Sequence, residues 1–279
     1  MEKLLSNSKV IVKDSKKPGP VVLIIAGVHG NEIGGVKALN ELVPKIVPLK
    51  GKVTFIYANL EAIKQNKRFV EKNLNRCFFD KQPKELANSL EGKTARELLP
   101  YLEEADVLLD LHSSKSSNSK KYVLCEKDCF KFVDALPVAI VLIGTDKFLP
   151  GGSDGYMFNH KKPGMCIECG LHESEDSKAT AKEAVTNLLK KLEMIPGVKS
   201  KYSQGDFYKA KYIYKNRFAE FKLARKFVDF EPLKSKELIG LEGEKKIFAK
   251  KGEFILFPDD QTELNKECFV IIKKVPKIK

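Results

Sequence analysis

The chain has 279 residues, of which 43% are hydrophobic and 31% are charged. That length suffices for one large domain, or for a domain of about 200 residues with a smaller one beside it, without disulfide support. No apolar run reaches the roughly 18 residues that a membrane span needs, and residues 1–17 are polar and dotted with lysine rather than signal-like. We therefore expect a globular protein of the cytoplasm with no membrane partner.

The formal net charge is +13, and the proportion of lysine to arginine among the basic residues is more informative than the net charge itself. Of the 50 basic residues, 45 are lysine and five are arginine, whereas nucleic-acid binders favour arginine for bidentate contacts to phosphates and bases. A solvated, lysine-rich surface is the simpler interpretation, and we expect no nucleic-acid partner. The six cysteines are too scattered for a disulfide scaffold or a zinc ribbon.

Strand and helix patterns alternate over the first two thirds of the chain. Apolar, β-branched runs predict strands over 21–26, 52–57, 106–111, 122–125, 138–143 and 165–169. Helical spacing of apolar residues predicts helices over 32–43, over 84–102 with a break near Gly92, and over 177–194. This alternation is typical of an α/β sheet with helices on both faces.

The pattern changes after Gly197. Short apolar runs separated by turn residues follow, and no long helical stretch appears among them. This texture is typical of a small all-β domain. We therefore expect two domains, over residues 1–198 and 199–279.

Histidine is rare in this chain, with four residues in all, and one of them directly follows a predicted strand. His29 stands in Gly-Val-His-Gly-Asn-Glu, after the strand over 21–26, and strand ends in open α/β sheets are where ligands bind. The spacing of His29 and Glu32 can bring an imidazole and a carboxylate to one cation. Taken alone, the motif fits a helix start with an exposed histidine at least as well.

A second histidine, His112, ends the strand-like run Val-Leu-Leu-Asp-Leu-His. Two histidines and one glutamate form a three-ligand set that leaves a fourth position for water, as in catalytic zinc sites. Asp110 lies two residues before His112, on the same face of a strand, where it can orient an imidazole. A polar cluster satisfied beneath the sheet is the alternative.

Glu168 and two of the few arginines complete the candidate set. Glu168 lies within the apolar strand Met-Cys-Ile-Glu-Cys, where a carboxylate is costly unless it is paired or functional. Beside an activated water it would act as a general base, whereas a lysine ion pair is the alternative. Most basic residues in this chain are lysine, so the arginines Arg68 and Arg76 suggest that a planar guanidinium is needed to bind a carboxylate or an oxyanion. Asn75, beside Arg76, would add a directional hydrogen-bond donor.

Four motifs occur in a recognisable order: Gly-Val-His29-Gly-Asn-Glu32, Asn73-Leu-Asn75-Arg76, Asp110-Leu-His112 and Ile167-Glu168-Cys-Gly170. In this order they resemble the succinylglutamate desuccinylase/aspartoacylase family, a branch of the zinc carboxypeptidase clan. The resemblance runs from about residue 21 to 170 and continues less specifically to Phe254-Ile-Leu-Phe-Pro258. It implies a zinc-carboxypeptidase-like mixed sheet within residues 1–198, followed by a C-terminal β domain.

The resemblance also implies a reaction and a set of site residues. It implies one zinc ion per chain, held by three side chains: His29, Glu32 and His112. Glu168 would be the general base and Arg68 would polarise the scissile carbonyl, while Asn75 and Arg76 would grip the substrate carboxylate. The protein would then be a zinc-dependent amidohydrolase (deacylase) that cleaves a small N-acyl amino acid or a related amide.

The sequence departs from the family pattern at three places, and these differences indicate a substrate pocket unlike that of aspartoacylase. Asn73 replaces the usual aspartate of Asp-Leu-Asn-Arg, which removes a charge that could steady Arg76. Phe158 falls near the place of a second substrate-binding arginine, and residues 268–279 offer no counterpart of the tyrosine that closes the aspartoacylase site. A carboxypeptidase acting on short peptides and a non-catalytic polyanion binder remain alternatives, and the sequence leaves a homo-oligomer open.

Three further features have simpler interpretations. Cys166 and Cys169 are three apart in a strand and so face opposite sides, which predicts buried reduced thiols. The polar loop over 113–121 fits a substrate lid and a plain solvated loop equally well. We expect His160 and His172 at the surface.

Overall fold

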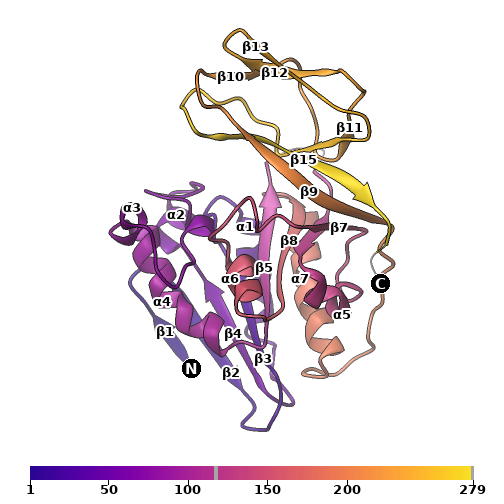
Figure 1. Ribbon diagram of the computed structural model, residues 1–279. Coiled ribbons are helices and arrows are strands. Elements are labelled where there is room, and N and C mark those ends of the chain that lie inside the picture. Colours follow the sequence, from indigo (N-terminus) through magenta and orange to yellow (C-terminus); the bar gives the residue numbers. More distant parts are fainter. Residues whose placement is uncertain (116–118, 278–279) are drawn as a thin grey trace.

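The computed structural model describes residues 1–115 and 119–277. Within these residues twelve strands form one sheet, in the order β1-β2-β4-β3-β5-β8-β6-β7-β9-β15-β14-β11, and a second sheet has the order β10-β12-β13. Figure 1 shows an α/β body that contains both the N-terminal strands and the helices, with the later strands standing above it. The sheet is mixed: β4, β3, β5 and β8 run parallel, whereas β2 pairs antiparallel with β4, and β6 with β8.

The strands of the body match the predicted ones closely. They are β1 (Glu2–Leu4), β2 (Lys9–Asp14), β3 (Val21–Ala26), β4 (Lys52–Tyr57), β5 (Val107–Ser114), β6 (Tyr122–Cys125), β7 (Ile140–Ile143) and β8 (Gly164–Leu171). The two N-terminal strands were not predicted: β1, at the edge of the sheet, is short and polar, whereas β2 was missed although it contains the β-branched run Val10-Ile11-Val12. β5 extends beyond the expected end and includes His112 itself.

Helices cover both faces of this sheet, as Figure 1 shows. The α-helices are α1 (Ile33–Leu42), α2 (Leu60–Lys64), α3 (Lys84–Ala87), α4 (Leu90–Glu104), α5 (Phe130–Val133), α6 (Ser153–Asn159) and α7 (Glu175–Lys191), and short 3-10 turns lie at η1 (Leu74–Arg76) and η2 (Lys127–Cys129). The break predicted near Gly92 is wrong in position. It falls before Ser89, whose hydroxyl oxygen accepts from the Gly92 backbone N–H and so begins α4.

The hydrophobic core lies in two layers, one on each face of the sheet. Alternate residues of β3 point to opposite sides: Val22 and Ile24 pack with residues of α1 and α7, whereas Leu23 and Ile25 pack with residues of α4 and α6. A strand buried on both faces reads as a continuous apolar run, which explains why Val21–Ala26 could be recognised from sequence. The two layers hold the carboxyl end of β3 rigidly in place.

The C-terminal strands are β9 (Asp206–Lys215), β10 (Phe221–Leu223), β11 (Glu231–Pro232), β12 (Leu238–Glu242), β13 (Lys245–Phe248), β14 (Phe254–Leu256) and β15 (Glu267–Val275). β9 pairs in parallel with β7, so that the main sheet continues from the body into this part. A separate apolar cluster, which includes Phe221 and Phe269, fills the region above. The division into residues 1–198 and 199–279 stays a prediction.

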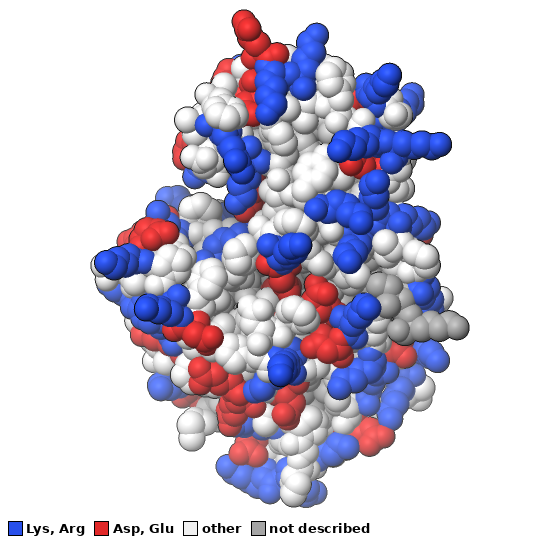
Figure 2. Space-filling view, in the orientation of Figure 1, with Lys and Arg blue, Asp and Glu red and all other residues white. Residues whose placement is uncertain are grey.

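These observations confirm the predicted fold class, a mixed α/β sheet with helices on both faces and a C-terminal all-β part. Among the described residues, none of the helices combines the length and the apolar character needed to cross a bilayer. Figure 2 shows lysine and arginine side chains scattered over both parts and interrupted by acidic ones, rather than gathered into one stripe.

Candidate active site

A tight turn after β3 brings His29 and Glu32 together. Gly27 begins the turn with φ +72, a left-handed conformation that glycine adopts without strain. At Gly30 the backbone runs so close to α2 that an added Cβ would lie 2.1 Å from the carbonyl carbon of Ala62. The Glu32 backbone N–H then donates to the His29 carbonyl oxygen at 3.2 Å, and α1 begins at the next residue. The glycines therefore serve the placement of two polar side chains.

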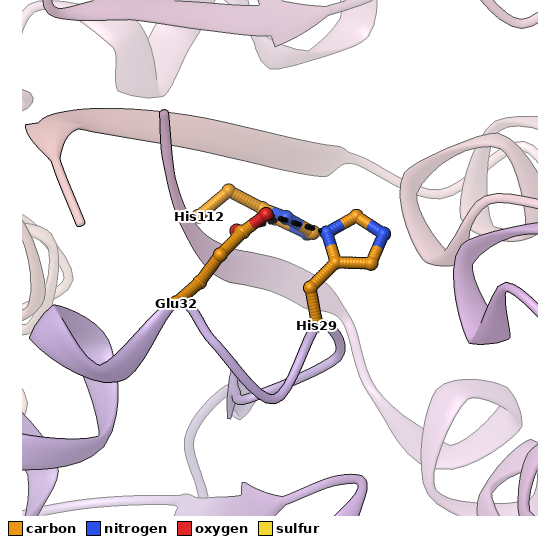
Figure 3. A group of neighbouring side chains, drawn as sticks. All are labelled: His29, Glu32 and His112. Carbon is orange, nitrogen blue, oxygen red and sulfur yellow. Dashed lines mark hydrogen bonds and ion pairs between the residues drawn. The ribbon is translucent and has the colours of Figure 1, made fainter. Parts of the chain in front are cut away.

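β5 lies beside β3 and carries His112 to the same edge of the sheet. The Glu32 carboxylate lies between the two imidazoles, with Oε1 2.7 Å from His29 Nδ1 and Oε2 3.0 Å from His112 Nδ1. Figure 3 shows this carboxylate pointing toward both rings from the start of its helix. All three side chains are buried, with exposed fractions of 3–4%. The structure thus brings together the three ligands expected from sequence.

The outer contacts of these three side chains fix their orientation. His29 Nε2 lies 3.0 Å from the Asn73 side-chain oxygen, which can accept its proton when Nδ1 holds a metal ion. The Ser113 backbone N–H donates to Glu32 Oε2 at 3.0 Å. Asp110 Oδ2 lies 3.2 Å from His112 Nε2 and accepts a hydrogen bond from the Ser153 hydroxyl. From the sequence, Asn73 was noted only because it lacks the charge that could steady Arg76. In the structure Asn73 instead contacts His29.

The donor set fits a zinc ion. The three ligand atoms lie within 4.8 Å of one another, and nitrogen and carboxylate oxygen are ordinary zinc ligands. Burial lowers the pKa of His29 to about 4, which keeps its imidazole neutral and able to bind a metal. Burial alone would lower the pKa of His112 too, but the Asp110 carboxylate holds it well above its ordinary value. The carboxylates of Glu32 and Asp110 both face His112, and a divalent cation would balance their negative charge.

Glu168 lies next to this group on β8. It stands directly beside His112 in the parallel pairing of β5 with β8, so both side chains project from the same face. Its side chain is 8% exposed, and Oε2 has no hydrogen-bond partner among the described residues. Burial, together with the charge of Glu32, raises the pKa of Glu168 to about 8. A nearby cation would favour its ionised form, which is the form a general base needs.

The two arginines lie on the segment between α2 and α4, and Arg68 contacts the site directly. Arg68 Nη1 donates to Glu32 Oε1 at 3.2 Å, although its side chain is half exposed. Arg76 Nη1 donates to the Asn75 carbonyl oxygen at 2.7 Å, and its Nη2 donates to Glu267 of β15 at 3.2 Å. The Asn75 side-chain oxygen accepts from the Ser153 backbone N–H, which leaves its amide group available to a ligand.

A buried carboxylate that the sequence analysis missed holds this segment in place. Glu91, at the start of α4, is 0% exposed. Its two oxygens accept hydrogen bonds from three successive backbone N–H groups, those of Val70, Glu71 and Lys72, at 2.7–3.4 Å. Asn59 donates to it as well. Glu91 lies among small and polar residues in the first turn of its helix, so the sequence does not distinguish it from a solvent-exposed glutamate.

Two other expectations concern residues around the site. His172 is half-buried rather than at the surface, because its Nδ1 lies 2.9 Å from the Ser113 hydroxyl. His160 is exposed, as expected, and stacks on Tyr156. Cys166 and Cys169 are buried free thiols, which confirms that prediction. The expected loop over 113–121 includes residues 116–118, which lie outside the described residues.

Comparison with known proteins shows the family to which the chain is similar. The family model for the succinylglutamate desuccinylase/aspartoacylase catalytic domain matches residues 18–192. A succinylglutamate desuccinylase from Idiomarina loihiensis is 23% identical over 91% of this chain and 83% of its own length. A probable aspartoacylase from Synechococcus sp. (strain CC9605) is 34% identical, but over 37% of this chain and 36% of its own length.

Solved structures share the fold along nearly the whole chain. A succinylglutamate desuccinylase from Vibrio cholerae superposes with a TM-score of 0.78 at 20% identity, covering 96% of this chain and 86% of that one. One from Vibrio parahaemolyticus gives a TM-score of 0.76 at 19% identity, covering 99% and 91%.

Fold and site together define a protein of the α/β type with a histidine–glutamate–histidine group at the sheet edge. The chain belongs to the succinylglutamate desuccinylase/aspartoacylase family, because the family model matches more than half of its length. The resemblance expected from sequence is therefore confirmed.

Proposed function

We propose that this protein is a zinc-dependent amidohydrolase that removes the acyl group from a small N-acyl amino acid. The observation that carries the proposal is the convergence of His29, Glu32 and His112 beside Glu168, whose buried Oε2 has no partner among the described residues. Family membership supports cleavage of an amide bond, since relatives carry the names succinylglutamate desuccinylase and probable aspartoacylase. The cytoplasmic location and the absence of nucleic-acid and membrane partners stay predictions.

Each side chain has a task in the proposed reaction. When bound at His29, Glu32 and His112, zinc would acidify a water and polarise the scissile carbonyl. Glu168 takes a proton from the attacking water and gives it to the leaving amine nitrogen, so that amide and water become carboxylate and amine. Arg68, which reaches Glu32, stabilises the negative charge that develops on the carbonyl oxygen.

Substrate binding falls to the segment that Glu91 holds in place. Arg76 and the free amide group of Asn75 would bind the carboxylate of the amino acid portion, since a guanidinium and an amide offer directional donors. Asn73 orients His29 through its side-chain oxygen, and Asp110 lies against the outer nitrogen of His112. These contacts hold the metal-binding nitrogens in place before a substrate arrives.

The test combines metal analysis with a substrate panel. We expect about one zinc per chain, hydrolysis of N-acyl amino acids, and loss of both on treatment with a chelator or in His112→Ala. Glu168→Gln should keep the zinc and lose hydrolysis by at least a hundredfold. Stoichiometric zinc in His112→Ala would contradict the ligand assignment, and near-normal turnover of Glu168→Gln would contradict the general base. Cleavage of dipeptides in place of N-acyl amino acids would select the carboxypeptidase alternative.

A further inference from the structure

His172 carries an imidazole that the proposed reaction does not use. It directly follows β8 and is half-buried. Its Nδ1 lies 2.9 Å from the Ser113 hydroxyl oxygen, and its Nε2 lies 3.4 Å from the side-chain nitrogen of Asn31. One ring therefore contacts two segments that are far apart in the sequence.

Both segments carry proposed zinc ligands. Asn31 lies in the turn after β3, directly before Glu32, and Ser113 directly follows His112 on β5. The Ser113 backbone N–H also donates to Glu32 Oε2 at 3.0 Å, so the position of Ser113 bears on the orientation of that carboxylate. The ring of His172 thus connects the turn that holds two of the ligands with the strand that holds the third.

A β-bulge turns His172 toward Ser113. The pairing of β5 with β8 shifts register after His112, so that β8 holds one residue more than β5 between two successive partner pairs. Gly170 lies in this stretch with φ +105, a backbone conformation that glycine adopts without strain. Because side chains alternate between the faces of a strand, the extra residue moves His172 to the face of Ser113, whereas regular pairing would leave it on the face of Glu168.

The hydrogen-bonding groups around the ring complement a neutral imidazole, which has one donor and one acceptor nitrogen. Burial lowers the pKa of His172, which favours this neutral form. The Asn31 side-chain oxygen is buried and has no hydrogen-bond partner among the described residues. A half-turn of the Asn31 amide brings this oxygen to Nε2, which donates to it while Nδ1 accepts from the Ser113 hydroxyl.

Backbone contacts hold the same region independently of the ring. The His172 backbone N–H donates to the Ser114 carbonyl oxygen at 3.0 Å. At Gly34, in the first turn of α1, an added Cβ would lie 3.4 Å from the His172 carbonyl oxygen and 2.4 Å from the Ser177 hydroxyl oxygen. Since the backbone of His172 is fixed in these two ways, removal of its ring tests what the side chain does.

We propose that His172 is a positioning residue for the zinc site, which holds the turn at Asn31 and the strand end at Ser113 at the spacing that the three ligands require. None of these three residues is itself a proposed ligand, and each acts through the segment that carries one. The inference rests on the proposed function, because it concerns the side chains that would bind zinc in that reaction.

The test measures the zinc affinity of the full chain by chelator competition. His172→Ala removes both ring contacts and should weaken zinc binding by about 10–100-fold, as loss of a contact behind a metal ligand commonly does. The matched control is His160→Ala, which removes an exposed histidine that stacks on Tyr156 and should leave the affinity unchanged. Equal zinc affinity in the two variants would overturn the inference.

A double-mutant cycle separates positioning from general damage. Because His172 acts partly through the Ser113 hydroxyl, adding Ser113→Ala to His172→Ala should cost little further affinity, whereas independent effects would multiply. The Tm of the zinc-free chain should change little, since the backbone contacts remain. Losses that multiply, or a large fall in Tm with unchanged zinc affinity, would overturn the inference.

The outcomes also separate this inference from the proposed function. An unaltered chain that binds no zinc would contradict the proposed function itself. A chain that binds zinc equally well with and without the ring of His172 would overturn the inference alone. Should His172→Ala not fold, Asn31→Ala removes one of the two ring contacts and should weaken zinc binding several-fold; unchanged affinity there would overturn the inference.

Discussion

Replacing Glu91 with glutamine should loosen the segment that carries Arg68 and Arg76. Glu91 is fully buried and accepts backbone N–H groups through both of its oxygens. Glutamine has nearly the same shape, but one of the two oxygens becomes an amide group that donates rather than accepts. The substitution therefore turns acceptors into donors that face donors, with little change in volume.

The structure sets the size of the effect. If the amide group replaces Oε2, the Lys72 N–H, now at 2.9 Å, loses its acceptor, and the Glu71 N–H, now at 3.2 Å, keeps only the long contact of 3.4 Å to Oε1. Each partly buried donor left unsatisfied costs about 1–2 kcal/mol, at the lower end of the usual range. We expect Glu91→Gln to lower the free energy of unfolding by about 2–4 kcal/mol. For a chain of this size that corresponds to a fall in Tm of about 4–16 °C.

Two measurements check this prediction. Urea unfolding gives the free energy, and steady-state kinetics should show a higher KM for N-acyl amino acids, because Arg76 is less well positioned. The matched control is Glu85→Gln on α3, which removes the same charge from an exposed side chain and should change stability by less than about 0.5 kcal/mol. If Glu91→Gln unfolds at the same urea concentration as the control, Glu91 does not organise this segment.

Two further predictions concern Asn73, which contacts a proposed metal ligand, and Arg76, which is proposed to bind the substrate. Asn73→Ala removes the acceptor for His29 Nε2 and should weaken zinc binding by about 10–100-fold in chelator competition; an unchanged affinity would show that the contact does not orient His29. Arg76→Lys should raise KM for carboxylate-bearing substrates several-fold while kcat changes less, because lysine lacks the planar fork. An unchanged KM would remove Arg76 from substrate binding.

Much of the fold could be predicted from local patterns. β4 and β6 have the expected bounds, and β3 was recognised because burial on both faces makes it apolar throughout. The errors fall where local signals are weak. Glycine at position 92 suggests a break, yet it lies inside α4, where an added Cβ would lie 1.9 Å from the Leu86 carbonyl oxygen. That close approach is a tertiary reason for glycine and leaves no trace in the helical pattern.

For the candidate site, the central residues could be predicted from sequence, but the residues that support them could not. His29, Glu32, His112 and Glu168 could be selected from sequence because each follows or interrupts an apolar strand, where a polar residue is costly without a purpose. Their supporting contacts could not be selected. Asn73, Ser113 and Glu91 are ordinary polar residues in sequence, and their roles depend on partners 19 to 59 positions away or on backbone groups that any residue carries.

The sequence by itself identified the candidate centre: which side chains could offer nitrogen and carboxylate ligands, and which strands bring them to one edge. This works because strand period and burial are local properties that polar interruptions reveal. The tertiary structure alone decided what surrounds that centre. Glu267 meets Arg76 from β15, a strand that begins far along the chain, and pairing between β7 and β9 brings that part alongside. Such long-range packing sets the charge around Arg76, and no local pattern encodes it.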